Sequence, residues 1–244
     1  MRWFRRRAER EPTSGGEPVD PRTPWPAAPG PEDPTEAAKR FWRRWSEILP
    51  DVSAALGDGE PLRVEHTLCE LVAALHPDLQ FSVERGQRSA YALVLSGQED
   101  PALRPYTDAW IAAAPDEDAM WEYHDSIPAV PDPSEVTVNL GPHRIGLAEV
   151  RVVAQVDSAE RAVDVAVYHP LFGELDAVAR ETMTFLPLEA SLGERQAATW
   201  LRRVEMATAP PEGAMTLVEF RELVTGLAEG TGEGDSGGGV GTAD

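Results

Sequence analysis

The sequence predicts an α+β protein with a mainly antiparallel sheet and helices packed on one face of that sheet. Two segments near the start, residues 34–57 and 61–76, carry apolar side chains at helical spacing. Later segments alternate apolar and polar residues and follow one another across short turns, as antiparallel strands do. Because no clean strand–helix–strand alternation appears, we expect antiparallel rather than parallel pairing.

The first helix is marked by its ends and by an aromatic stripe. Asp33 can cap its N-terminus, Pro34 suits the first helical position, and Glu36 lies three residues after the cap. Pro50 is expected to end or kink the helix, with a further turn reaching Gly57. We expect its wide apolar face to be core rather than a partner-binding surface. That face comprises Ala38, Phe41, Trp42, Trp45, Ile48 and Leu49.

The remaining elements follow from residue alternation and from helix-breaking residues. Helices are predicted over residues 61–76, 100–115, 175–183 and 216–228, the last opened by a capping box of Thr216 and Glu219. Strands are predicted over residues 79–83, 91–95, 121–123, 136–140, 145–156 and 163–167. The stretch 198–206 fits a helix or a strand, and its alternation favours a strand.

Both ends of the chain differ in composition from its middle. Residues 1–32 are rich in proline, glycine and charge, and residues 229–244 are mostly glycine with acidic residues. Such segments bury too little apolar surface to offset their chain entropy, so we expect both to be disordered. The same reasoning predicts a single α+β domain over residues 33–228.

The chain is strongly acidic, with 42 acidic and 22 basic side chains and a net charge of −20. Residues 34–228 carry 32 of the acidic and 16 of the basic side chains, so the excess belongs to the folded part. A field of this sign repels phosphate backbones, and we expect no nucleic-acid binding. It favours a basic protein as partner.

Other features bear on the compartment of the protein. Cys69 is the single cysteine, so neither an internal disulfide nor a multi-cysteine zinc site is possible. No signal peptide and no apolar run of about 18 residues are present, so we expect a cytoplasmic protein without a transmembrane segment. Trp3, Phe4 and the arginines Arg5–Arg7 could contact an anionic membrane surface, although the segment is short.

Two motifs in the glycine-rich tail match chemical signatures without the context that those signatures need. Residues 234–238 resemble the nucleophile loop of trypsin-like proteases, and residues 232–237 formally match a dinucleotide-binding fingerprint. The first needs a rigid β-barrel framework, and the second needs a strand before it and a helix after it. The five histidines form no metal-binding motif, so we expect neither a metal ion nor a cofactor.

Several polar residues near strand ends are candidates for a site assembled from scattered parts of the chain. Alternate residues of a strand share a face, so we expect His124 to form a surface ion pair with Glu122. The candidates for a pocket are Tyr123, His124, Asp125, Arg151 and His169.

Four short pieces of the sequence stand out together. They are Phe41-Trp42 with Trp45, the run His76-Pro77-Asp78-Leu79, Ala113-Ala114-Pro115 before Trp121, and Leu192-Gly193-Glu194. Together they resemble an uncharacterised family of bacterial proteins that share a domain of unknown function. The resemblance covers about residues 33–228 and implies no established activity, cofactor or catalytic residue.

We therefore expect a non-catalytic intracellular interaction protein, either an adaptor or an immunity-type inhibitor of a basic protein. The acidic folded part and the lack of a catalytic signature favour this interpretation. The alternative is a small-molecule-binding protein or an enzyme with a site assembled from scattered residues. That alternative predicts a deep pocket lined by convergent polar groups with perturbed pKa values.

Overall fold

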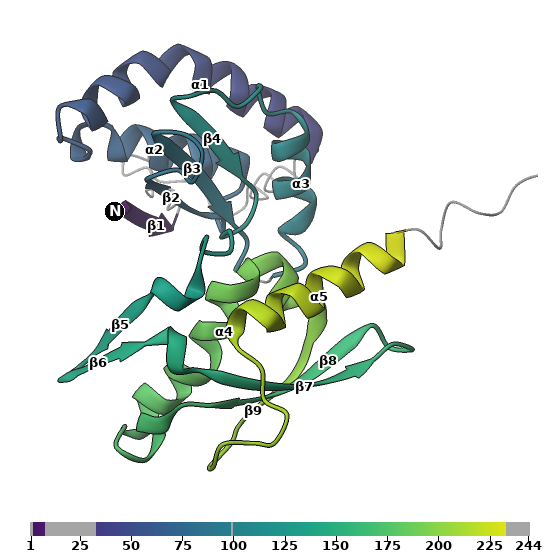
Figure 1. Ribbon diagram of the computed structural model, residues 1–244. Coiled ribbons are helices and arrows are strands. Elements are labelled where there is room, and N and C mark those ends of the chain that lie inside the picture. Colours follow the sequence, from purple (N-terminus) through teal and green to yellow (C-terminus); the bar gives the residue numbers. More distant parts are fainter. Residues whose placement is uncertain (1, 8–32, 99, 233–244) are drawn as a thin grey trace, which may run out of the picture. The chain divides into compact units, whose positions relative to one another are not determined.

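The computed structural model describes residues 2–98 except 8–32, and residues 100–232. The chain forms two compact units, unit 1 over Met1–Ile127 and unit 2 over Pro128–Asp244. Each unit has a hydrophobic cluster of its own. Figure 1 shows the helices and strands of the two units. The single domain predicted over residues 33–228 does not anticipate this division.

Unit 1 contains three helices in its described part, α1 (Pro34–Gly57), α2 (Leu62–Leu75) and α3 (Arg104–Ala112). The predicted cap of α1 is confirmed, because the Asp33 carboxylate accepts the Thr35 backbone N–H at 2.8 Å. Pro50 does not end α1, which runs unbroken to Gly57. The buried stripe continues beyond Pro50 through Val52 and Leu56, and this packing stabilises the last turns.

The described strands of unit 1 form one sheet in the order β1-β2-β3-β4. Their bounds are β1 Arg2–Arg7, β2 Gln80–Glu84, β3 Tyr91–Ser96 and β4 Trp121–His124. The first two pairs are antiparallel and β3 pairs with β4 in parallel. All three helices join one hydrophobic cluster with alternating residues of a single sheet face. The sheet residues of that cluster are Phe81, Val83, Leu93, Leu95, Trp121 and Tyr123.

The structure describes a short part of each terminal segment. Residues 2–7 form β1 along the outer edge of β2, where backbone groups of β2 are available for pairing. This strand contains Trp3, Phe4 and Arg5–Arg7, the residues considered for membrane contact. At the other end, the last helix continues beyond residue 228 as far as Gly232. Residues 8–32 and 233–244 lie outside the described residues.

Unit 2 begins with a hairpin and continues with a second sheet in the order β7-β8-β9. The hairpin strands are β5 (Thr137–Leu140) and β6 (His143–Gly146). The sheet strands are β7 (Arg151–Asp157), β8 (Ala162–Tyr168) and β9 (Leu201–Met206). Two helices, α4 (Ala177–Trp200) and α5 (Leu217–Gly232), pack with this sheet in one hydrophobic cluster. The predicted α+β class, rich in antiparallel pairs, is thus confirmed.

Two predicted elements of unit 2 were wrong in extent. The long strand predicted over residues 145–156 is divided by a 3₁₀ turn at Leu147–Glu149, which buries the Leu147 side chain. The helix predicted over residues 175–183 extends as α4 to Trp200, past Pro187. Of the ambiguous stretch 198–206, the first three residues are helical and the other six form β9.

Helix α4 is interrupted at Gly193, and carbonyl groups just before the interruption accept hydrogen bonds from other parts of unit 2. Gly193 has φ 75° and ψ 163°, a backbone conformation that is essentially restricted to glycine. Such a break leaves carbonyl groups of the preceding turn without helical partners. The Ala190 carbonyl accepts the Val130 N–H at 2.9 Å, and the Ser191 carbonyl accepts Nε–H of Arg221 at 2.6 Å.

The two units share one chain topology. In unit 1 the order β2-β3-α3-β4 places an antiparallel hairpin before a helix that returns the chain parallel to β3. In unit 2 the order β7-β8-α4-β9 does the same, with β9 parallel to β8. No internal repeat in the sequence accompanies this repeated ββαβ topology, so it is visible only in the structure.

Candidate functional site

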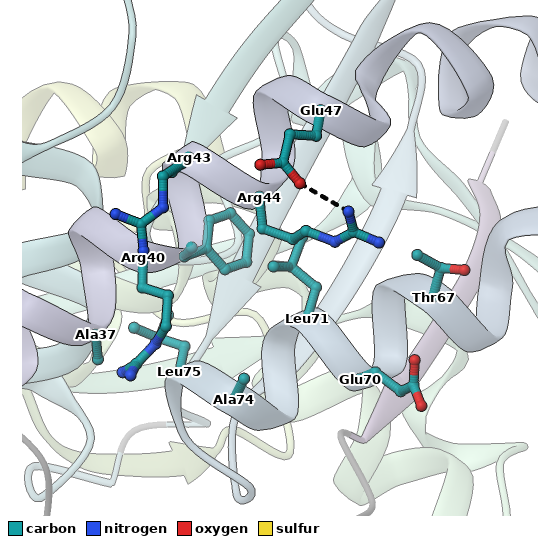
Figure 2. A pocket seen from close by; sticks show the side chains of 11 residues that line it. Ala37, Arg40, Arg43, Arg44, Glu47, Thr67, Glu70, Leu71, Ala74 and Leu75 are labelled. Atoms are coloured by element: carbon teal, nitrogen blue, oxygen red, sulfur yellow. Dashed lines mark hydrogen bonds and ion pairs between the residues drawn. The ribbon is translucent and has the colours of Figure 1, made fainter.

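A groove between α1 and α2 is the candidate functional site of unit 1 (Figure 2). It encloses about 350 Å³ and combines charged side chains with an apolar floor. We call it the α1–α2 groove. From α1 it is lined by Ala37, Arg40, Phe41, Arg43, Arg44 and Glu47, and from α2 by Thr67, Glu70, Leu71, Ala74 and Leu75.

The spacing of residues on α1 explains why arginines border this groove. Positions three and four apart in a helix share a face, so Arg40, Arg43, Arg44 and Glu47 form one charged row. The row lies beside the buried apolar stripe that packs into the core of unit 1. All four of these side chains are exposed, whereas Phe41, which belongs to the adjacent apolar stripe, is only 2% exposed.

The apolar floor of the groove is held in place by the aromatic core. The Phe41 ring lies edge-on to Trp42 and to Trp110, at centroid distances of 5.2 and 5.7 Å. It stacks near Trp45 at 6.5 Å, and the Trp42 Nε1–H donates to the Trp110 carbonyl at 2.7 Å. The aromatic stripe predicted to be core is therefore confirmed as core. Its packing gives the groove a preformed floor.

Side chains of both charges line the groove. Arg44 donates to Glu47 at 2.7 Å, and Glu70 lies 3.4 Å from the His66 ring on the same helix. The lining thus contains three guanidinium groups against two carboxylates, and both carboxylates already have a basic neighbour. The lining carries one more guanidinium group than carboxylates, although the protein as a whole is acidic. Guanidinium groups bind carboxylates and phosphates in a bidentate geometry, so this rim suits an anionic group.

Glu122 on β4 is the most perturbed acidic group in the described part of the chain. Its side chain is fully buried and accepts the backbone N–H groups of Gln87, Arg88 and Ser89 at 2.8, 2.8 and 3.0 Å. Burial acts to raise the pKa of Glu122. The His124 bond at 3.0 Å and the three backbone donors outweigh that effect and bring this pKa to about 2.

The contact predicted between His124 and Glu122 is present, with His124 Nε2 3.0 Å from a Glu122 carboxylate oxygen, but it does not lie on the surface. Glu122 is inaccessible and the His124 side chain is only 19% exposed. The three N–H groups that surround the carboxylate belong to the connection between β2 and β3, so the side chain anchors that loop to β4. Because four donors already surround the two carboxylate oxygens, Glu122 has a structural role.

Tyr123 lies on the opposite face of β4 and belongs to the aromatic core. Its hydroxyl accepts Nε1–H of Trp45 at 3.1 Å, and burial raises the pKa of Tyr123 although this bond acts against the shift. Asp125 follows the strand and accepts the Ser126 hydroxyl at 3.3 Å. The three neighbouring candidates Tyr123, His124 and Asp125 therefore do not converge on one cavity.

The other two candidates, Arg151 and His169, lie in unit 2 at one end of the β7–β8 pair. His169 is fully buried; its Nδ1 accepts the Leu171 N–H at 3.1 Å, and its Nε2 lies 3.3 Å from the Gly146 carbonyl. Burial lowers the pKa of His169, against the opposing effects of Gly146 and Glu149, so the neutral ring is favoured.

Arg151 donates to the carbonyl groups of Ala148 and Val150 at 2.9 and 2.8 Å. These bonds tie it to the 3₁₀ turn before β7 rather than to a cavity. The five predicted pocket residues are thus divided between the two compact units, and the groove contains none of them. Sequence reasoning missed Arg40, Arg43 and Arg44, although their spacing beside an aromatic stripe is a signal that could have identified them.

Two further observations concern ligands and membranes. Among the described residues, no three His, Cys, Asp or Glu side chains come together as metal ligands. In the same part of the chain, no helix has both the length and the apolar composition required to cross a bilayer.

Comparison with family models, with curated proteins and with solved structures gives no match. The resemblance to an uncharacterised bacterial family accordingly stays a prediction.

Proposed function

We propose that this protein is a non-catalytic interaction protein that holds a segment of a partner protein in the α1–α2 groove. The observation that carries the proposal is the composition of that groove, in which buried apolar side chains lie beside a row of exposed arginines. Protein interfaces commonly combine a buried apolar anchor with a charged rim, and arginine is enriched in them. An adaptor or an immunity-type inhibitor would need such a surface and no catalytic group.

The environments of the titratable groups support a binding role over catalysis. Glu122 is saturated by backbone donors, His169 bridges backbone groups, and the Tyr123 hydroxyl bonds to Trp45. A catalytic acid or base needs a position within reach of substrate, in a cavity. These three side chains instead bond to loops or to core residues of their own units. These bonds and their burial account for the shifted pKa values of all three.

The dimensions of the groove support a peptide anchor. A volume of about 350 Å³ lies at the lower end of the ~300–1,000 Å³ typical of small-molecule pockets. It accommodates one or two large side chains of a partner, which is how a few anchor residues provide most of the binding energy in many interfaces. A groove of this volume could also bind a small anionic metabolite, which is the second candidate. A thermal-shift screen of such metabolites would reveal a stabilising ligand.

Site-specific photo-crosslinking tests the proposal. Benzoylphenylalanine is introduced at Ala74, an exposed residue that lines the groove on α2. The matched control carries the same group at Ala54, which is exposed on α1 but does not line the groove. After irradiation in a lysate of the source cells, we expect one specific crosslinked protein from position 74 and none from position 54. Equal labelling from both positions, or none from position 74, would refute the proposal.

A further inference from the structure

The outer edge of β2 in unit 1 already carries a strand from a distant part of the chain, β1. The two strands are antiparallel, and Phe4, Arg5, Arg6 and Arg7 lie opposite Val83, Ser82, Phe81 and Gln80. We propose that this edge is a strand-addition site for an extended, arginine-rich segment of a partner protein, and that β1 occupies the site within the chain. β2 contributes no residue to the lining of the α1–α2 groove, so the inference is independent of that groove.

Contacts other than those with β1 hold β2 in unit 1. On its other side β2 pairs with β3 along its whole length, from Gln80 to Glu84. Phe81 and Val83 are 1% and 0% exposed and belong to the hydrophobic cluster that includes the three helices. We therefore expect β2 to stay in place when β1 leaves, with an edge of backbone groups ready to pair with another strand.

β1 can be exchanged without disturbing the other strands of the sheet. In the strand order β2 is its one described neighbour. Residues 8–33 join β1 to α1, and a connection of this length can span roughly 90 Å when fully extended. Strand addition depends mainly on main-chain hydrogen bonds, so an incoming extended segment can replace those of β1 one for one.

Charge defines the chemistry of the incoming segment. β1 contains four arginines and no acidic residue, whereas residues 33–127 contain 18 acidic and eight basic residues. Asp78 lies just before β2, and Glu84, its last residue, lies opposite Arg2. Main-chain pairing depends little on sequence, so this charge selects a basic segment over an acidic one. The sign agrees with the basic partner that the net charge of the chain favours.

Peptide binding to the full chain tests the inference, with the sequence of β1 as the probe. A fluorescent, end-capped peptide of residues 2–7 is titrated into the wild type and into the variant F4P/R5P at about 0.15 M salt, which screens long-range attraction. Adjacent residues of an antiparallel strand alternate in their bonding, so one of the two prolines removes a donor to β2 and releases the edge. The peptide should bind the variant at least about tenfold more tightly, the factor expected if β1 occupies the edge in about nine-tenths of wild-type molecules.

Two matched peptides separate strand pairing from charge attraction. The first has the same side chains but a methyl group on every backbone nitrogen, so it keeps the charge and lacks the main-chain donors. It should bind the variant at least about tenfold more weakly, because strand addition depends on those donors. The second has glutamate in place of each arginine and keeps the donors, and it should also bind more weakly, because unit 1 is acidic.

Hydrogen exchange and a second released variant locate the binding. Amides of β2 should exchange faster in F4P/R5P than in the wild type, and the peptide should restore their protection. The variant R5E/R6E/R7E releases the edge by charge reversal instead of proline and should show the same gain in affinity. The control R43E/R63E/R104E makes the same change of charge at three exposed arginines outside β1 and β2, and it should bind as the wild type does. Circular dichroism melting verifies that the variants fold.

Several results would overturn the inference. Equal affinity of the methylated peptide would reduce the binding to charge attraction. Equal affinity for the wild type and both released variants would show that β1 does not occupy the binding site. Tighter binding of the glutamate peptide would refute the arginine-rich segment. A wild-type dimer in light scattering that both released variants lose would make a second copy of this chain, and not a partner protein, the occupant of the edge.

Discussion

The carboxylate of Glu122 accepts the backbone N–H of Arg88 at 2.8 Å, although the two residues are 34 positions apart in the sequence. The same side chain binds the N–H groups of Gln87 and Ser89, so a single buried carboxylate holds the loop between β2 and β3. This loop is further joined to the chain before β4, where the Ser89 hydroxyl donates to the Asp118 carbonyl at 2.5 Å. These bonds join the β2–β3 loop to β4 and to the segment before it.

Replacing Glu122 by Gln should lower the free energy of unfolding by about 2–3 kcal/mol, because it removes a charged acceptor and turns an amide NH₂ toward backbone donors. Urea denaturation followed by tryptophan fluorescence measures the change. The Glu47→Gln control alters an exposed pair and should change stability by less than about 1 kcal/mol. A loss of similar size in both variants would show that the buried anchor has no special importance.

The pH dependence of stability should reveal the same group. The pKa of Glu122 in the folded protein, about 2, lies below its usual value of 4.5, so the ionised carboxylate stabilises the fold. This contribution, about 3 kcal/mol, is complete above pH 4.5 and is lost as the pH falls toward 2. The stability difference between wild type and the Glu122→Gln variant should shrink over that window. A difference that stays constant down to pH 2 would contradict the assignment.

Gly86 is the position in the anchored loop where a side chain has no room. A Cβ atom there would lie 2.6 Å from the Ser89 carbonyl oxygen and 3.0 Å from the Glu122 carboxyl carbon. We expect Gly86→Ala to destabilise the protein by about 1–3 kcal/mol. Gly57→Ala is the matched control, because a Cβ there meets nothing within 4 Å and alanine favours the helix. Thermal melting of the two variants should therefore shift in opposite directions.

Arg221 on α5 performs a comparable function in unit 2. Its guanidinium donates to the carbonyls of Ser191, Pro131 and Val130 at 2.6, 2.9 and 2.7 Å. The ammonium group of lysine cannot reproduce this planar set of donors, which we call the Arg221 fork. Arg221→Lys should therefore lower the free energy of unfolding by about 1–3 kcal/mol. Hydrogen exchange of the Val130 amide, which bonds to the Ala190 carbonyl, should accelerate. The exposed Arg144→Lys substitution serves as the control, and equal exchange rates in both variants would refute the role of the fork.

Local signals in the sequence were sufficient for much of the fold. Asp33 with Pro34 predicted the start of α1, and Thr216 with Glu219 predicted the start of α5, where the Glu219 carboxylate accepts the Thr216 N–H at 2.7 Å. Caps involve residues two or three apart, so the sequence contains all of their partners. The strand alternation around Phe81 likewise predicted the β2–β3 hairpin.

Features that depend on distant contacts could not be predicted in this way. Pro187 suggests a helix end by a local rule, yet α4 continues beyond it because its apolar residues pack into the core of unit 2. The burial of Glu122 depends on donors more than 30 residues away in the sequence. Strand periodicity indicates only that Glu122 shares a face with His124. The α1–α2 groove likewise requires two helices to pack before the arginines line a common surface.

The parallel pairing in both units also sets the order in which a growing chain can complete them. All described strands of unit 1 have been synthesised once the ribosome passes His124. In unit 2, β8 has no neighbour on one side until residues as far as Met206 have been made, because β9 follows the long helix α4. Unpaired strand edges associate readily with other chains. The interval between the synthesis of Tyr168 and that of Met206 is therefore when a nascent molecule is most exposed to aggregation.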